Sequence, residues 1–596
     1  MRLTLHAAPL ALLGACANAP LPPWLPLPGA RPAVVVTAPA PEPTTRAQDA
    51  SVNTLPPMTS PVPDPAASMT PPVPRGVPPP YGEAVAAKFA DPAVIYSTPG
   101  MQSGRGTWSS AAEAQAWLRE QQRRAGRAGV KADVVTLGST PGGSPIEALV
   151  LTKAAGADPQ ALRESQRPTV LLVGQQHGGA PAGSEALLVV ARELAQGLLT
   201  PLLDKINVIV LPQADPDAAQ APSSSFAAGA PVTMISTAVP PAQPLDAPAS
   251  SKVDRDHLRL DTPQARALAA VARDYQPVVM LEAHEYPAIG KHLDTFGLLP
   301  KSDLRFAYAM APNLPEFLTK AADEWFRRPM LAALKTRELS AEWSNTASGD
   351  RNAQQVLLGS ASPESLLNAY GLKNIISLRI ESRGAGLDRL HAQRRLHTHV
   401  TAIGSVMASA AQRASELGQL RPYLDSDVGA QACQGELTIT ADPTPAELDL
   451  TLLDPLSGAE RVVTVQSQSA LALRKTRGRV RPCGYWMAPD AAHAAERLRL
   501  HGVKVMRVGD AGSMLADMFR PRTGGSTARA EVALLRGLID TPAGSFYVPL
   551  DQPLGNLVAA AMEPDAQGSY VDNGLLRLPS VARIMGKPTG RLGEMP

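Results

Sequence analysis

Hydrophobic and polar positions alternate in blocks between residues 81 and 420. Short apolar runs of strand length are separated by longer stretches that have the spacing of amphipathic helices. Runs that are apolar throughout are typical of strands buried on both faces of a sheet. The pattern therefore predicts an α/β fold in which helices flank a mixed, largely parallel sheet. The strand candidates are residues 169–173, 206–211, 277–281 and 374–380, and a helix candidate follows at 184–196.

The pattern changes in residues 421–596. Residues 436–440 and 447–452 alternate apolar with polar side chains, as half-exposed antiparallel strands do. Farther along, we expect a helix over 491–500, ended by Gly502, and a strand over 503–508. This part of the chain is predicted to form a smaller, β-rich domain of mixed structure.

The first 80 residues follow neither pattern. In residues 1–16, Arg2 precedes a mostly apolar run that ends in Leu13-Gly14-Ala15-Cys16, which resembles the lipobox of a bacterial lipoprotein signal peptide. Cys16 would then be the lipidated first residue of the mature chain, and the alternative is an ordinary cleaved signal followed by a free cysteine. Residues 17–80 are dominated by Pro, Ala, Ser and Thr and cannot bury a core, so they are predicted to be a disordered tether.

Composition restricts the compartment and the partners. No other stretch approaches the roughly 18 apolar residues of a membrane helix, so lipid would be the only anchor of a protein in the cell envelope, on its periplasmic face. In an oxidising compartment Cys433 and Cys483 could pair, although the sequence does not give the distance between them. The formal net charge is only +2 and no dense Lys/Arg run occurs, so nucleic acid is not expected as a partner.

Candidate chemistry lies at the ends of the predicted strands. Ligands of open α/β sheets bind outside the carboxyl ends of the strands, where His177, His284 and Glu381 follow their apolar runs. The segment His177-Gly178-Gly179-Ala180 resembles the first metal-binding segment of the zinc carboxypeptidases of the carboxypeptidase A type. His284 matches the second ligand of that family, and Glu381 matches its general base.

The resemblance extends over residues 107–417 and implies the zinc-carboxypeptidase fold for residues 81–420. Asp254 and Arg255 resemble the Asn-Arg pair that binds the substrate's terminal carboxylate. The family's zinc has three protein ligands and one open position, where the metal lowers the pKa of water and polarises the scissile carbonyl. The resemblance implies that Glu381 moves the proton and that Arg255 forms a two-pronged contact with the carboxylate.

Three positions depart from the family. Ala180 stands where a Glu ligand is usual, and a methyl group cannot bind zinc. Glu185 on the following helix and Glu282 near His284 are the two candidate substitutes. Lys252 replaces an Asp that usually orients a ligand imidazole, and no Arg lies between Arg192 and Arg255, where the family has the residue that stabilises the developing oxyanion.

Three functions remain open from the sequence. The first is a zinc carboxypeptidase that cuts C-terminal bonds of peptides or of peptidoglycan stem peptides in the envelope, with activity reduced or lost. The second is a metal-free pseudoenzyme that binds peptides or cell-wall fragments. The third is a structural or assembly lipoprotein whose partner contact is made by the C-terminal domain around residues 547–553, a stretch that resembles the C-terminal extension of some bacterial relatives.

Overall fold

The computed structural model of the protein describes residues 79–220, 253–521, 532–588 and 592–595. All of these belong to one compact unit, Leu55–Pro596. Cys16, Lys252 and the predicted tether up to residue 78 lie outside the described residues. Within the ranges above, no helix is long and apolar enough to cross a membrane.

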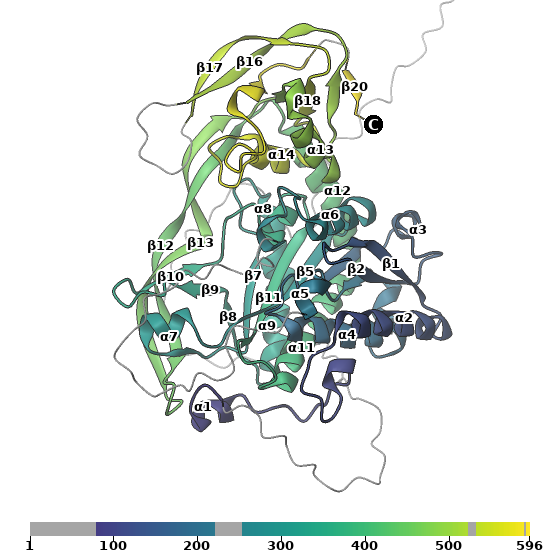
Figure 1. Ribbon diagram of the computed structural model, residues 1–596, viewed down its shortest axis with the longest axis vertical. Helices are drawn as coiled ribbons and strands as arrows, with labels where there is room; N and C mark the ends of the chain where they lie inside the picture. The colour runs from purple at the N-terminus through teal and green to yellow at the C-terminus, as the bar shows by residue number, and fades with distance from the viewer. Residues whose placement is uncertain (1–78, 221–252, 522–531, 589–591, 596) are drawn as a thin grey trace, which may run out of the picture. The chain divides into compact units, whose positions relative to one another are not determined.

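An eight-stranded mixed sheet forms the centre of the α/β part (Figure 1). Its middle pairs, β4–β3, β3–β5 and β5–β11, are parallel, whereas β1–β2, β2–β4 and β11–β7 are antiparallel and β7–β8 is parallel again. In spatial order the strands are β1 (Lys131–Ser139), β2 (Pro145–Thr152), β4 (Asn207–Leu211), β3 (Thr169–Gly174), β5 (Val279–Pro287), β11 (Ile376–Ala385), β7 (Leu304–Tyr308) and β8 (Ala341–Trp343).

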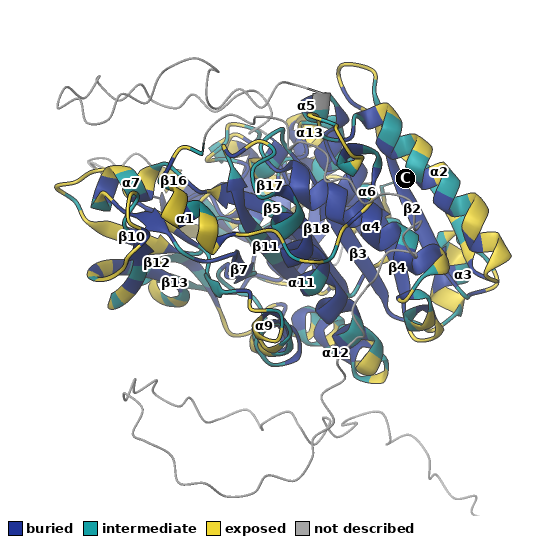
Figure 2. Cartoon of the chain, turned by 90° about the horizontal axis from the view of Figure 1, so that it is seen from below, coloured by how far each residue is buried: buried dark blue, intermediate teal, exposed yellow. Residues whose placement is uncertain are grey.

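Helices cover both faces of this sheet, and its central strands are buried (Figure 2). One face carries α2 (Ala111–Arg127), α4 (Pro181–Gln196), α9 (Arg328–Lys335) and α11 (Ala392–Gln412). The other carries α3 (Pro159–Glu164), α6 (Pro263–Tyr275) and α10 (Leu366–Gly371), whose apolar side chains share a core with β2, β3 and β4. The shorter helices are α1 (Glu83–Lys88), α5 (Pro216–Gln220), α7 (Lys291–Phe296) and α8 (Glu316–Ala321), and α12 (Ala414–Ala430) follows α11.

The observed strands show where the sequence pattern was incomplete. The four predicted strands correspond to β3, β4, β5 and β11, but β5 and β11 run several residues farther than their apolar runs. The reason is that their parallel ladder continues through the polar pair Glu381–His284 and on to Arg383–Tyr286. Two of the candidate side chains therefore lie within paired strands, which fixes their backbone.

A second sheet joins the α/β part to the C-terminal region. Its strands are β6 (Leu299–Pro300), β12 (Glu436–Leu453), β13 (Glu460–Val480), β10 (Gln355–Leu358) and β9 (Asn345–Ala347). The predicted separate strands at 436–440 and 447–452 are one strand, β12, because register shifts near Thr438 and Pro443 accommodate the intervening polar, Pro-containing residues. β13 pairs in parallel with β10, and β12 pairs with β6.

The third sheet is entirely C-terminal, so the predicted fold class, with its β-rich C-terminal part, is confirmed. It contains β17 (Val532–Thr541), β16 (Gly512–Pro521), β19 (Val581–Ile584), β14 (Gly484–Met487), β18 (Phe546–Pro549), β15 (Met506–Val508) and β20 (Leu592–Glu594), with helices α13 (Ala492–Leu500) and α14 (Gly555–Met562) beside it. Gly502 follows α13 with φ of +91°, as the predicted cap requires. The Cys433 and Cys483 sulfurs are joined in a disulfide.

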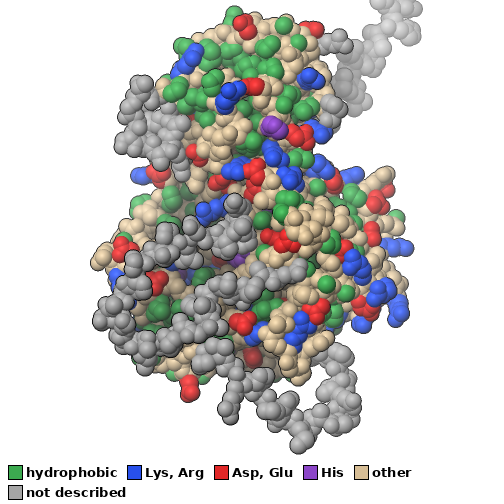
Figure 3. Space-filling model, viewed as in Figure 1, with side chains coloured by type: hydrophobic (Ala, Val, Ile, Leu, Met, Phe, Trp, Pro, Cys, Tyr) green, Lys and Arg blue, Asp and Glu red, His purple; other side chains and the backbone are tan. Residues whose placement is uncertain are grey.

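One of the interpretations left open by the sequence placed a partner contact around residues 547–553. In this stretch β18 is an inner strand between β14 and β15, and Tyr547 and Val548 are buried, whereas Asp551 and Pro553 are exposed, so a partner contact there stays a prediction. Exposed apolar side chains of this region include Leu515, Leu535 and Leu538 on the paired strands β16 and β17. Figure 3 shows hydrophobic side chains gathered at this end of the molecule.

A buried amine gives the fold a testable pH dependence. Lys373 follows α10, its Nζ lies 4.9 Å from the Tyr370 ring centroid, and it has no hydrogen-bond partner among the described residues. Burial, together with the nearby Arg273 and Arg421, lowers the pKa of Lys373 from 10.5 to about 7. Because the unfolded chain binds this proton more tightly, the destabilisation is complete below the folded pKa and declines as the pH rises toward 10.5.

We expect Lys373→Met to raise the free energy of unfolding by at least about 1 kcal/mol near neutral pH, since it removes the cost of burying an unpaired ammonium. Urea denaturation at a series of pH values measures this gain, which should shrink as the pH approaches 10.5. A gain of equal size at every pH would show that Lys373 is not the titrating group.

Candidate functional site

Two imidazoles and a carboxylate converge at the carboxyl edge of the large sheet. His177 follows β3, His284 lies on β5, and Asp254 lies on the segment before α6. The Nε2 atoms of His177 and His284 are in direct hydrogen-bond contact. Asp254 Oδ2 is 3.6 Å from His177 Nε2 and 4.0 Å from His284 Nε2. Among the described residues, these three side chains form the group of His, Cys, Asp and Glu that could hold a metal ion.

The close approach of α4 to β5 places His177 beside His284. Gly183 lies in the first turn of α4 against the β5 backbone, where an added Cβ would stand 2.6 Å from the Ala283 carbonyl oxygen. Only glycine permits that contact without a shift of the helix. Pro181 occupies the first turn of α4, where its missing N–H leaves no hydrogen bond unmade. The loop that carries His177 is thereby held between the ends of β3 and β5.

The His177 ring is held in a neutral form. The Gly179 N–H donates to His177 Nδ1 at 3.1 Å. Burial, with the neighbouring His284, lowers the pKa of His177 to about 4. A neutral imidazole is the form that binds a metal ion, so the ring is available as a ligand near neutral pH.

Glu381 lies on β11 directly beside His284. Its Oε1 is 3.8 Å from His284 Nδ1, and its Oε2 accepts a hydrogen bond from the Ser344 hydroxyl. Ser344 follows β8, so a distant part of the chain orients this carboxylate. One carboxylate oxygen is fixed and the other faces the imidazole pair, an arrangement suited to proton transfer at the site.

A second layer of polar residues lies one step deeper along the same strands. Glu282 pairs with Arg379 across β5 and β11, and Arg379 Nε donates to Glu282 Oε2 at 2.7 Å. Gln176 donates to the other oxygen of Glu282, and His257 Nε2 donates to Gln176 Oε1 at 2.6 Å. Burial alone would lower the pKa of Arg379, but Glu282, Glu381 and Asp254 raise it above its ordinary value. The Arg379 guanidinium therefore interacts electrostatically with all three carboxylates.

The two candidate substitutes for the missing Glu ligand, Glu185 and Glu282, form hydrogen bonds with other residues. Ala180 is fully buried at the start of α4. Glu185 accepts hydrogen bonds from the Thr98 hydroxyl and the Ser109 N–H, and burial raises its pKa. Both oxygens of Glu282 are occupied in the deeper layer. Neither Glu belongs to the group of three side chains that could hold a metal ion. Asp254 does belong to it and faces the two imidazoles, although the sequence analysis had assigned this residue to the carboxylate pocket.

Arg255 is exposed, and no described residue forms a hydrogen bond or ion pair with it. Its guanidinium is therefore available to a ligand, in keeping with its predicted role. Gln176, Ser344 and Arg379 were missed by sequence reasoning. Arg379 could have been found, because it precedes Glu381 by two residues on one strand and so shares its face, but no local signal places Ser344 at the site.

The site residues fit a zinc ion. Two nitrogens and one carboxylate oxygen are the donor types of a catalytic zinc site, which leaves a fourth position free. Asp254 Oδ1 and His284 Nδ1 are buried atoms without a hydrogen-bond partner in the described chain. Around them, the three carboxylates of Asp254, Glu282 and Glu381 against one Arg379 guanidinium leave two negative charges in excess, which a divalent cation would balance.

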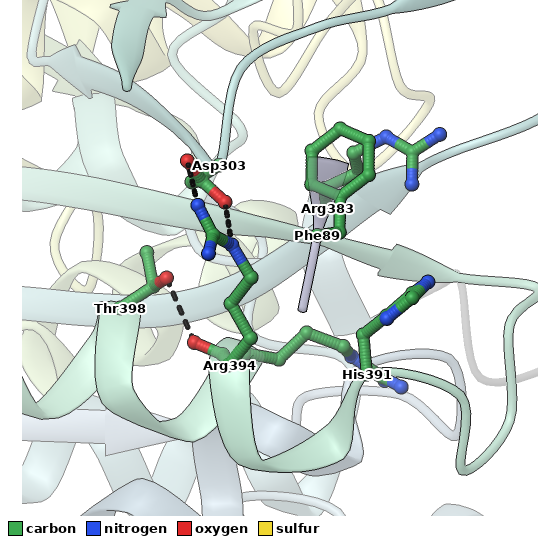
Figure 4. Close-up of a pocket in the computed structure, with 7 residues that line it drawn as sticks. Phe89, Asp303, Arg383, His391, Arg394 and Thr398 are labelled. Atoms are coloured by element: carbon green, nitrogen blue, oxygen red, sulfur yellow. Dashed lines mark hydrogen bonds and ion pairs between the residues drawn. The ribbon is translucent and has the colours of Figure 1, made fainter. Parts of the chain in front are cut away.

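A separate charged cluster that contains one ion pair lies at the start of α11 (Figure 4). Arg394 donates to both oxygens of Asp303, at 2.6 and 3.1 Å. Arg383 lies over the Phe89 ring, with its guanidinium carbon 4.1 Å from the ring centroid, and donates to the Pro300 carbonyl. These contacts fasten the segment after residue 79 to the domain, which is a structural role.

Residues 116–224 match the family model described as zinc carboxypeptidase. Carboxypeptidase 2 of Trichophyton equinum is 24% identical over 441 residues, which cover 69% of this chain and 74% of that protein. Carboxypeptidase 2 of Trichophyton rubrum is 23% identical over 430 residues, with the same coverage of 69% and 74%.

Two solved structures are also similar. Carboxypeptidase A from Helicoverpa armigera has a TM-score of 0.37 at 16% identity, covering 56% of this chain and 80% of its own. The metallo-carboxypeptidase from Burkholderia cenocepacia has a TM-score of 0.34 at 14% identity, covering 51% and 70%. The family-model match includes His177 and Ala180 and supports the zinc-carboxypeptidase family, while Asp254, His284 and Glu381 lie beyond the matched residues.

Proposed function

We propose that this chain is a zinc-dependent peptidase that removes residues from the carboxyl end of peptides, with a rearranged set of metal ligands. His177 and His284 would bind zinc together with Asp254, which would replace the Glu that is missing at Ala180. The observation that carries this proposal is the convergence of Asp254 on the two imidazoles beside Glu381, with a buried carboxylate oxygen still unpartnered. The family-model match supports it.

The side chains around the three donors have separable tasks. Zinc bound there would supply Lewis-acid polarisation of a carbonyl and a lowered pKa for water. Glu381 Oε1 would take the proton of the attacking water and deliver it to the leaving amine, while Ser344 holds Oε2. Arg255 is exposed, and no described residue forms a hydrogen bond or ion pair with it. Its guanidinium would bind the terminal carboxylate of the substrate.

The test combines metal content with cleavage. The chain without its signal peptide should bind close to one equivalent of zinc. The zinc-loaded protein should release the C-terminal residue from blocked dipeptides. Glu381→Gln should keep the metal, because Glu381 is not a proposed ligand, and should lower kcat by about 10²–10⁴ fold, since it removes the general base. Zinc binding without any cleavage in the unmodified chain would refute the peptidase and leave a metal site.

One observation favours a second candidate, a metal-free protein that binds peptides without cutting them. The His177–His284 contact already satisfies one nitrogen on each ring, and Ala180 cannot contribute a donor. Zinc at these nitrogens would have to displace that contact. Peptide binding that is unchanged by a strong chelator, in a chain that takes up no zinc, would select this candidate.

The location and natural substrate are part of the proposal. The lipobox-like segment supports a lipid anchor at Cys16 in the cell envelope, where peptides or peptidoglycan stem peptides would be the substrates. Cys16→Ser should move the protein from the membrane fraction to the soluble fraction, because lipid is the only anchor predicted. Unchanged membrane association of this variant would exclude lipidation as the anchor.

A further inference from the structure

The cationic end of the Arg379–Glu282 pair is turned toward the candidate site. Arg379 uses Nε for Glu282, and no described residue accepts a hydrogen bond from its two terminal nitrogens. Those nitrogens are also absent from the buried atoms without partners, so they reach solvent. The Arg379 side chain is 21% exposed and that of Glu282 is 1% exposed. The pair therefore presents its positive end outward and its negative end to the interior.

Glu282 cannot turn outward to compete with a ligand for Arg379. Its second oxygen is held by Gln176, which is itself held by His257. Burial lowers the pKa of His257 to about 3, so this ring stays neutral and its Nε2 proton remains committed to Gln176. The series of hydrogen bonds from His257 through Gln176 and Glu282 holds the Arg379 guanidinium in one position. Such preorganisation strengthens the binding of a carboxylate.

We propose that Arg379 is a specificity-determining residue that binds a carboxylate on the side chain of the substrate's C-terminal residue. The inference rests on the proposed function. Arg379 and Glu282 precede Glu381 and His284 by two residues on paired strands, so they lie about 6.6 Å deeper on the same face. A substrate with its scissile bond between Glu381 and the two imidazoles would reach this depth with the side chain of its terminal residue.

The geometry selects acidic terminal residues over neutral and basic ones. The terminal carboxylate itself has Arg255 as its available partner on the exposed side of the site. Glu and Asp side chains can form paired hydrogen bonds with the two free nitrogens of Arg379, whereas Gln forms weaker ones and Lys is repelled. The substrate class is therefore peptides that end in an acidic residue.

The experiment measures binding rather than turnover. Zinc-loaded chain carrying Glu381→Gln is titrated calorimetrically with blocked dipeptides that differ only in a terminal Glu, Gln or Lys. We expect the peptide ending in Glu to bind at least about tenfold more tightly than the one ending in Gln, because the contact is charge-assisted. The peptide ending in Lys should bind most weakly.

Variants in the same background identify the residue responsible. Arg379→Met combined with Glu282→Gln avoids an unpaired buried carboxylate and should abolish the Glu/Gln ratio, while Arg379→Lys should retain part of it. Arg255→Met is the matched control and should weaken all peptides without changing the ratio. A Glu/Gln ratio that survives loss of Arg379 would overturn this assignment alone, whereas no binding of any peptide would overturn the proposed function with it.

Discussion

Replacing Asp254 with Asn is expected to lower zinc affinity by at least about a hundredfold. Loss of a group that merely orients a ligand costs 10–100-fold, and Asp254 is placed to be a ligand itself, with Oδ2 at 3.6 and 4.0 Å from the two imidazole nitrogens. The change also removes one of the carboxylates that leave the site two charges negative. Competition with a chromophoric chelator measures the affinity, and mass spectrometry measures the zinc content.

A rescue variant separates ligand loss from a damaged site. In the Asp254→Asn background, Ala180→Glu should restore zinc binding, because it returns a carboxylate to the position where related proteins carry one. Asp261→Asn is the matched control, since this exposed aspartate lies in the same segment and pairs with Arg259. It should bind zinc as the unmodified chain does. Unaltered affinity in Asp254→Asn would exclude Asp254 as a ligand.

Arg395→Met should destabilise the fold by about 3–5 kcal/mol, the usual cost of breaking a buried ion pair. Arg395 on α11 holds both oxygens of Glu285, and the two side chains are 3% and 0% exposed. Glu285 also accepts the N–H of Ala182 in the first turn of α4. The substitution therefore leaves a buried carboxylate without its cation beside His284.

Urea denaturation of the zinc-free protein measures this effect. Adding Glu285→Gln to Arg395→Met should recover much of the loss, because the amide oxygen still accepts from Ala182 and no charge remains buried. Arg123→Met breaks the exposed pair with Glu120 and should cost far less stability than Arg395→Met, because solvent screens exposed ion pairs. Equal losses for the buried and the exposed substitution would contradict the role of Arg395.

Sequence reasoning located the framework of the site because strand ends are readable. The apolar runs before His177, His284 and Glu381 correspond to β3, β5 and β11, whose parallel pairing brings the three residues to one edge. The order of those strands in the sheet is not written in the runs themselves. No strand order was predicted from the sequence, and the structure supplies it.

The loops were beyond sequence reasoning for a physical reason. Asp254 and Arg255 are neighbours in the chain, but Asp254 faces the imidazoles while Arg255 reaches solvent. Which way each side chain points depends on the backbone turn between them, and no periodic pattern encodes that turn. Ser344 likewise reaches Glu381 only because β7 and β8 pair beside β11.

The shared second sheet determines how the molecule should melt. β13 supplies a parallel neighbour to β10, and β12 supplies an antiparallel neighbour to β6, so strands from either side of residue 420 complete a single sheet. A truncation after residue 420 would strip those strands of their hydrogen-bond partners. On heating, the α/β part and the C-terminal region should therefore unfold in one calorimetric transition. The temperature up to which the candidate metal site stays folded would then depend on residues far outside that site.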